Sequence, residues 1–216
     1  MRSAVGAVTA GFGVLAALAG MEHGVGEMLQ GNVRPEGLVI QSWPDAAFFR
    51  IEAGEPAMTI VPNLLASGVL TIFVSAVFLV CAVGFAHRRH GGLVLVGLSI
   101  LLLLVGGGFG PPLLGIIVGL AATRIGAPLT WWRTRLAPAI RRPLATSWPG
   151  AFAACLGAWL LLVPGLPILS YTLGVEDPAL VGVLFLAALG LLALSIVAAL
   201  ARDAGRHTIT ATSIAR

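Results

Sequence analysis

Runs of about 20 apolar residues recur along this chain of 216 residues, and they constrain its fold more than any other feature. A helix needs about that length to cross the hydrocarbon core of a bilayer. Hydrophobic residues make up 58% of the sequence and charged residues only 10%, whereas a soluble domain carries about 25% charged residues. The sequence therefore predicts an all-α integral membrane protein.

Six apolar helical segments are expected within a single transmembrane domain, residues 1–202. They cover residues 4–21, 63–86, 92–105, 112–123, 151–170 and 179–201, separated by a polar segment over 22–61 and an arginine-rich loop over 124–147, and followed by a polar tail over 203–216. Cytoplasmic loops carry an excess of basic residues. This rule predicts that the arginine-rich loop and both termini are cytoplasmic and that the acidic segment is external. We expect the chain to lie in the inner (plasma) membrane of a bacterium.

The first apolar run has two interpretations. Ala17, Leu18 and Ala19 offer the small-x-small pattern of a signal-peptide cleavage site. Small residues that include Gly6, Gly13 and Gly20 also recur every three or four positions through that pattern, and such a seam lets another helix approach closely. We favour a retained helix over a cleaved signal peptide.

The third and fourth apolar segments are joined by a glycine-proline turn that contains Gly106, Gly107, Gly108, Phe109 and Gly110. Glycine is a poor helix former, and the following two prolines lack amide donors. One helix over 91–122 would be about 48 Å long, against a hydrocarbon core of about 30 Å. A hairpin is therefore predicted, either as two short full spans with an external turn or as a re-entrant loop whose backbone could bind a solute.

Glu22, His23 and Glu27 form the most suggestive cluster of chemical groups. His23 and Glu27 are four residues apart and share a helix face, so imidazole and carboxylate could hold one metal ion or serve one proton path, with Glu52 or Glu55 as further ligands. The simpler interpretation is a helix end that meets water. Because no larger matched set of ligands accompanies them, no cofactor is expected.

Two further patterns indicate contacts with helices and lipid. Gly115 and Gly119 form a GxxxG step, which permits close helix packing within the chain, in a homo-oligomer or against another membrane protein. The aromatic and basic residues of the loop suit a segment at the bilayer surface, with indoles at headgroup depth and guanidinium groups on anionic lipid. These residues are Trp131, Trp132, Arg133 and Arg135. The positive-inside rule explains the basic charge, so no nucleic-acid partner is expected.

No Walker loop, GxSxG elbow, HExxH or CxxC motif is present. Three hypotheses for the function therefore remain. The leading one is the binding or passage of a small solute without enzymatic chemistry, through the hairpin turn and Glu27. The second is a structural or interaction subunit of a larger membrane complex, and the third is an extracytoplasmic metal-dependent enzyme built on Glu22, His23 and Glu27.

Four short stretches, residues 23–24, 27–32, 56–63 and 106–115, resemble a group of small multi-pass prokaryotic membrane proteins described as hypothetical. The resemblance extends over about residues 4–126. It implies a membrane location for this chain and no particular activity.

Overall fold

The computed structural model describes residues 3–214, and for residues 206–214 it describes the backbone alone. The fold is mostly helical, with 74% of residues in helices. In chain order the elements are α1 (Ala4–Leu29), β1 (Val39–Gln41), η1 (Ala47–Glu52), β2 (Pro56–Met58), α2 (Leu64–Val80), η2 (Cys81–Phe85), α3 (Gly91–Leu104), α4 (Gly110–Ala122), α5 (Thr130–Thr134), α6 (Pro138–Leu160), η3 (Leu161–Gly165), α7 (Leu166–Leu173) and α8 (Pro178–Ile214).

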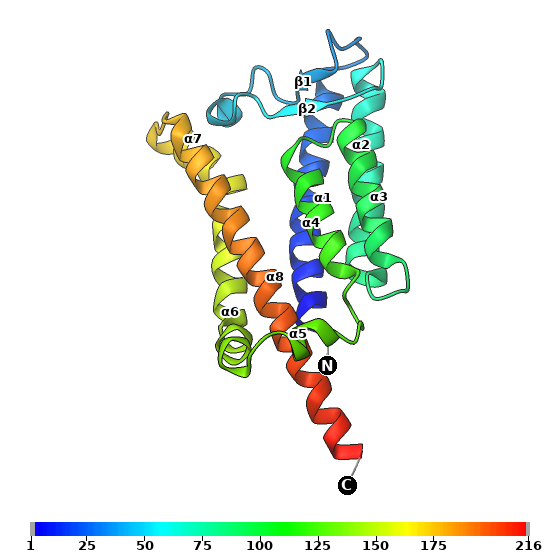
Figure 1. The fold of residues 1–216 in the computed structure, drawn as a ribbon. Coiled ribbons are helices and arrows are strands. Elements are labelled where there is room, and N and C mark those ends of the chain that lie inside the picture. Colours follow the sequence, from blue (N-terminus) through cyan, green and yellow to red (C-terminus); the bar gives the residue numbers. More distant parts are fainter. Residues whose placement is uncertain (1–2, 215–216) are drawn as a thin grey trace.

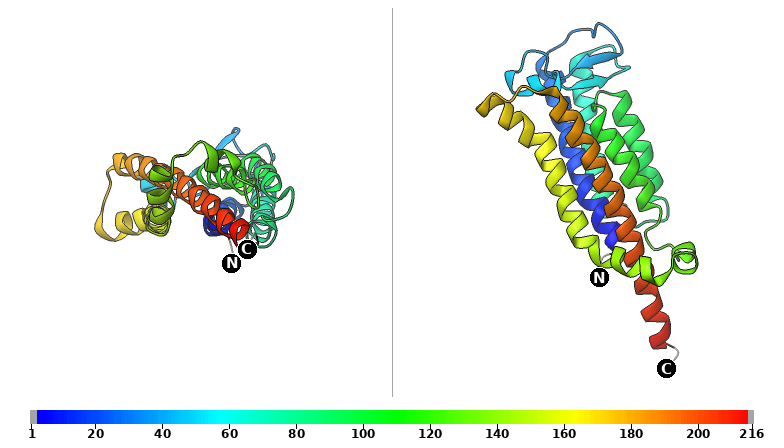
Figure 2. Two further views of the ribbon diagram at one scale, coloured as in Figure 1. Left: turned by 60° about the horizontal axis from the view of Figure 1, so that its bottom comes forward. Right: turned by 60° about the vertical axis from the view of Figure 1, so that its left-hand side comes forward.

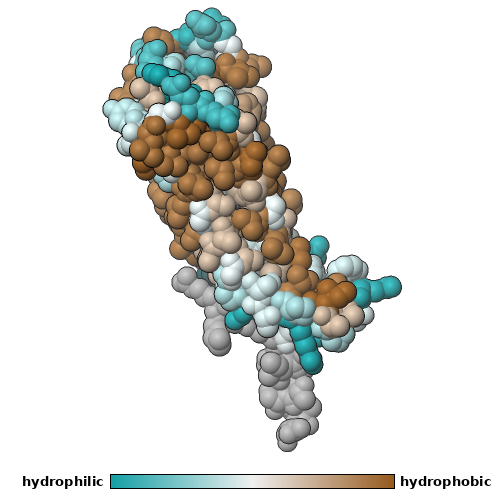
Figure 3. Space-filling view, turned by 90° about the vertical axis from the view of Figure 1, so that its left-hand side faces the viewer, coloured by the Kyte–Doolittle hydropathy of each residue, from teal (hydrophilic) through white to brown (hydrophobic). Residues whose placement is uncertain are grey.

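Four helices are long and apolar enough to cross a membrane: 4–29, 64–85, 138–173 and 178–205. The two arms of the hairpin, α3 and α4, are shorter apolar helices. Figure 3 shows the corresponding hydrophobic band on the surface, between hydrophilic groups at the two ends of the molecule. The prediction of a helical membrane protein is confirmed at this level.

Helix α1 lies at the centre of the bundle. It packs against α2 and α4 on one side and against α8 and α6 on the other (Figures 1 and 2). Phe12 on α1 meets the ring of Phe152 on α6 edge to face, with 5.6 Å between the ring centroids. The first apolar run is thus an integral part of the hydrophobic core in this structure.

The hairpin is present as two antiparallel helices, and the single helix over 91–122 does not form. Other helix boundaries also differ from the predicted ones. Helix α1 continues past residue 21 to Leu29, because its late glycines, Gly24 and Gly26, pack against other backbone and do not break the helix. The helix expected over 151–170 begins already at Pro138, where proline is tolerated in the first turn.

That helix also continues through Pro164 to Leu173, past the predicted end at residue 170. Pro164 lies in η3, one turn of π-helix, and widening the turn accommodates the missing proline amide. The polar tail likewise continues α8 as far as Ile214, and residues 215–216 of the predicted tail lie outside the described residues.

A cap segment, residues 30–63, covers one end of the bundle (Figure 1). Its strands β1 and β2 pair antiparallel, with Ile40 opposite Ala57. The strand direction continues onto the hairpin, because Thr59 forms a β-bridge with Val105 and the Ile60 amide donates to the Leu104 carbonyl at 2.9 Å. Gly106, Gly107 and Gly108 therefore lie buried beneath the cap segment instead of exposed at the surface.

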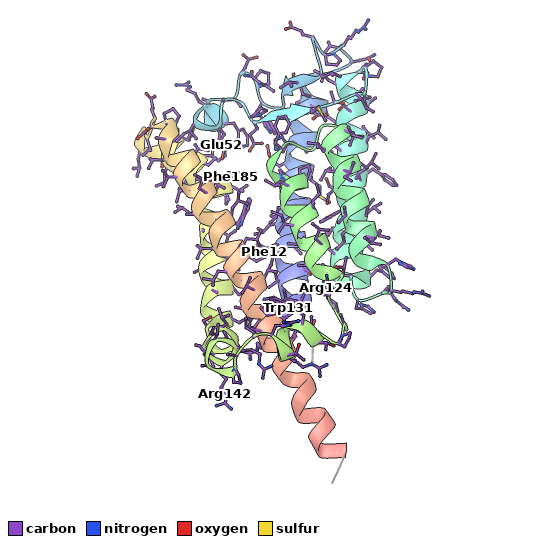
Figure 4. All side chains as sticks on the ribbon, in the orientation of Figure 1. Phe12, Glu52, Arg124, Trp131, Arg142 and Phe185 are labelled. Carbon is purple, nitrogen blue, oxygen red and sulfur yellow. The ribbon has the colours of Figure 1, made fainter. Side chains whose placement is uncertain are left out.

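The two ends of the bundle differ in charge. Both chain ends lie at the end opposite the cap segment, together with Arg124, Trp131 and Arg142, whereas Glu52 lies at the cap end (Figure 4). Among the nine acidic residues of the sequence, Asp203 alone belongs to the end with the termini. The separation of charge expected from the sequence is thus present in the fold.

Candidate functional site

A cluster of one imidazole and two carboxylates lies where α1 meets the cap segment. The side-chain ligand atoms of Glu22, His23 and Glu55 all lie within 4.8 Å of one another. The Nε2 atom of His23 is 3.5 Å from Oε2 of Glu55. His23 and Glu55 are buried and Glu22 is half-buried. These are the groups and the spacing that a bound metal ion requires.

The imidazole of His23 is oriented by a hydrogen bond at Nδ1, the ring nitrogen that does not face Glu55. Its Nδ1 atom shares a hydrogen bond of 2.9 Å with the Ser42 hydroxyl. When Nδ1 carries the proton and donates, Nε2 keeps its lone pair toward the carboxylates, which is how outer partners orient metal-binding histidines. Ser42 is held by Gln30, whose side-chain amide donates to the Ser42 carbonyl at 3.0 Å. Gln30, at the end of α1, thus fixes the backbone of Ser42, whose hydroxyl orients the imidazole of His23.

Glu55 is positioned by an unusual stretch of backbone. Ala53, Gly54 and Glu55 all have positive φ angles, of 54°, 72° and 53°. Left-handed conformations cost non-glycine residues about 1–3 kcal/mol each and persist only where surrounding contacts enforce them. Here the Ser42 amide donates to the Glu55 carbonyl at 3.0 Å. The turn stores strain at the residue that faces His23, which is a common property of functional sites.

Glu52 adds a third carboxylate to this region. Burial raises the pKa of the Glu52 carboxyl to about 9, and the neighbouring charge of Glu55 adds to the rise. No arginine side chain of the described residues forms an ion pair with Glu22, Glu52 or Glu55. A positive charge bound among these groups would relieve their mutual repulsion.

An apolar cavity of about 310 Å³ adjoins the cluster. Its walls come from α1, α4, η1 and the α6–η3 helix, and among the described residues that line it only Glu22 and Glu55 are charged. Leu18 and Leu160 in its wall are also exposed on the surface. The cavity therefore connects the carboxylates with the hydrophobic surface of the bundle.

The glycine turn lies against both Glu27 and His23 at the cap end of α1. A Cβ atom on Gly106 would overlap the Glu27 carboxylate, and one on Gly108 would overlap His23 Nε2. Gly107 packs against Leu102. Glu27 does not belong to the cluster of Glu22, His23 and Glu55.

The last two predicted residues of the turn lie apart from these polar groups. Phe109 is exposed, and a side chain at Gly110 would meet open space. The proposed contribution of Phe109 and Gly110 to a polar site gains no support from their placement.

The glycine seams are used within the chain. Gly13 approaches Ala82, Gly20 approaches Ser75 and Leu102, and Gly115 approaches Ser99 and Phe78. Gly119 packs against the Gly92 carbonyl and Val96, while Gly6 contacts only Ser3, the N-cap of its own helix. These contacts favour the packing of helices within one chain over docking of a second protein.

The aromatic and basic residues predicted for the bilayer surface lie at the end with the termini. Helix α5 holds Trp131, Trp132 and Arg133, and Arg135 follows it. Trp131 and Arg135 are exposed, and Trp132 and Arg133 are half-exposed. Their position at this end of the bundle suits the contact with lipid headgroups that the sequence pattern suggests.

Comparison with known proteins adds no assignment, because no family model, curated protein or solved structure matches the chain. The site rests on its geometry alone. Sequence reasoning named Glu22 and His23, considered Glu55, and missed Ser42. No pattern in the sequence indicates Ser42, since it is brought to His23 by the pairing of β1 with β2.

Proposed function

We propose that this chain is a membrane protein that binds a divalent transition-metal ion through Glu22, His23 and Glu55, and presents that ion to a small apolar molecule in the adjoining cavity. The observation that carries the proposal is the convergence of the three ligand atoms within 4.8 Å at the wall of the cavity. The proposal replaces our leading expectation of solute binding at Glu27 and departs from the expectation of no cofactor.

The chemistry of the ligands supports a particular class of ion. Imidazole nitrogen with carboxylate oxygen suits Zn²⁺, Mn²⁺, Fe²⁺ and related ions, whereas Ca²⁺ and Mg²⁺ are bound by oxygen atoms. Two ionised carboxylates and one neutral imidazole also balance a double positive charge. The Ser42 hydroxyl supplies the outer contact that metal-binding histidines usually have.

Three protein ligands leave room for a fourth, and metal sites that bind an exchangeable ligand keep such a position open. Because Glu22 and Glu55 belong to the cavity wall, a molecule in the cavity could reach that position. The apolar walls favour a ligand with a hydrocarbon part and a single metal-binding oxygen. We place this site on the external face of the inner membrane, with both termini cytoplasmic, because arginines gather at the end with the termini.

The test is metal content. The full-length protein is purified in detergent, exposed to EDTA, reloaded with Zn²⁺ or Mn²⁺, desalted, and measured by inductively coupled plasma mass spectrometry. We expect one equivalent of metal in the wild type and none in His23→Ala or Glu55→Gln. His87→Ala is the matched control, because His87 is exposed in a loop at the other end, and it should keep the wild-type content.

Ser42→Ala provides a graded test that does not remove a ligand. Loss of an outer contact typically lowers metal affinity by about 10–100-fold, so this variant should bind one equivalent with weaker affinity in a competition titration. Wild-type protein that folds but retains no metal after reloading would contradict the proposal. So would equal metal content in His23→Ala and the wild type.

A further inference from the structure

The carboxylate of Glu27 is fully buried, and neither of its oxygens accepts a hydrogen bond from any residue that the structure describes. Glu27 is one helical turn beyond His23, outside the cluster of Glu22, His23 and Glu55. A buried ionised carboxylate without a partner is strongly disfavoured. Its surroundings must therefore provide either a proton or a cation.

The hydroxyl beside Glu27 has no hydrogen left for it. Ser67 is the side-chain hydroxyl that faces the carboxylate, and a serine hydroxyl has a single hydrogen. That hydrogen is donated to the Val105 carbonyl at 2.6 Å. Thr71 donates to the same carbonyl at 2.6 Å, and the Thr59 hydroxyl pairs with Ser67 at 2.7 Å. With its hydrogen on the Val105 carbonyl, Ser67 turns a lone pair toward Glu27.

The glycine turn beside Glu27 has backbone carbonyls without an amide partner. Gly106 and Gly108 have φ angles of 112° and 74°, and Gly106 lies directly against the Glu27 carboxylate. Among the described residues, no backbone amide donates to the carbonyls of Gly106, Gly107 and Gly108. The reason lies in the sequence, because the amides that a continuing helix would offer to residues 107 and 108 belong to Pro111 and Pro112, which have none.

We propose that Glu27 and the turn of Gly106–Gly108 form a binding site for a sodium ion. The Glu27 carboxylate is buried, no donor among the described residues reaches it, and its one formal negative charge balances one monovalent cation. Unwound backbone at the end of a membrane helix coordinates Na⁺ in this way in transporters. The site has no nitrogen or sulfur ligand, so it differs in kind from the cluster at His23 and can be tested without a metal there.

The test measures thermal unfolding of the purified full-length protein at equal ionic strength in sodium, potassium or choline chloride, with EDTA present as its choline salt. A ligand that binds only the folded state raises the unfolding midpoint with its concentration. We expect the midpoint in sodium to exceed that in choline by several degrees, with a smaller rise in potassium. Equal midpoints in sodium and choline at every concentration would overturn the proposal and indicate a protonated Glu27.

Glu27→Gln tests the residue directly. The amide has nearly the shape of the carboxylate, removes the charge and adds an N–H donor. We expect this variant to fold in choline at least as well as the wild type and to show no response to sodium. Glu36→Gln, which changes an exposed residue of the cap segment, is the matched control and should respond as the wild type does. A sodium response that survives Glu27→Gln would overturn the assignment.

Two measurements keep the result decisive. Binding of radioactive ²²Na⁺ to the wild type, displaced by unlabelled sodium and not by choline, reports the site without any variant. If Glu27→Gln fails to fold, saturable and displaceable binding supports the site and its absence overturns it. Glu55→Gln separates the two proposals, since it should lose the divalent metal and keep the sodium response.

Discussion

Asp203 should hold the first turn of α1 in place. Its Oδ1 atom accepts from the Ala4 amide at 2.8 Å and its Oδ2 atom from the Val5 amide at 3.0 Å, in a buried position. The first amides of a helix have no partner within the helix, and a carboxylate is favoured at this positive end. A hydrogen bond to a charged group contributes about 1.5–3 kcal/mol. Two such bonds together contribute about 3–6 kcal/mol. We expect Asp203→Ala to destabilise the protein by about 3 kcal/mol, the lower end of this range, because water molecules replace part of the lost hydrogen bonding.

Thermal unfolding of the purified protein measures this effect. For about 200 residues, 3 kcal/mol corresponds to a fall of roughly 6–12 °C in the unfolding midpoint. Asp203→Asn keeps one oxygen acceptor and should lose about half as much. Ser3→Ala, which removes the separate bond of 2.9 Å from the Gly6 amide to the Ser3 hydroxyl, should cost about 1 kcal/mol.

The same variants test whether the first apolar run is retained. Cleavage after Ala19 would remove both amides that Asp203 accepts from, and Asp203→Ala would then unfold at the wild-type temperature. An unchanged midpoint would therefore refute the structural role of Asp203. N-terminal sequencing of the purified wild type would show whether cleavage is the cause.

Three further substitutions have definite expected outcomes. Ala53→Gly relieves a left-handed residue and should raise the free energy of unfolding by about 1 kcal/mol in chemical denaturation, whereas destabilisation would contradict the strain assigned to this turn. Gly108→Ala places a methyl group against His23 at a positive φ, so we expect a loss of about 3 kcal/mol together with weaker metal binding. Gly119→Leu should abolish folding, measured as monodisperse protein after size-exclusion chromatography, while Gly190→Leu, at a position with open space, should leave the yield unchanged.

Much of the fold could be predicted because the bilayer limits the choices. Backbone groups in hydrocarbon must be satisfied internally, so long apolar runs become helices, and the clustered glycines and prolines after Leu104 end one helix and begin the next. Helix ends were less predictable. The continuation of α1 to Leu29 depends on Gly24 and Gly26 packing against Gly68 and Ser42, and that tertiary contact leaves no local signal.

The site could be predicted only where its residues share one helix. Glu22 and His23 are neighbours in the sequence, and their position at the end of an apolar run is conspicuous. Glu55 and Ser42 reach them through a short β-pairing and three consecutive left-handed residues. Pairing register and positive φ at non-glycine residues are not encoded in hydrophobic periodicity, so the choice of Glu55 over Glu52 as third ligand, and the orienting hydroxyl, become evident only in three dimensions.

The role of the hairpin turn depends on the segment that covers it. Gly106 and Gly108 were expected as a turn, and a turn exposed to water would need glycine only for chain reversal. Here the cap segment covers the turn, Gly106 abuts Glu27, and Gly108 abuts His23. The absence of side chains at these two positions lets one loop approach an imidazole and a carboxylate at once. An ion bound at Glu27 would therefore shift the loop that contacts His23. The affinity of the divalent metal should depend on sodium concentration in the wild type and not in Glu27→Gln.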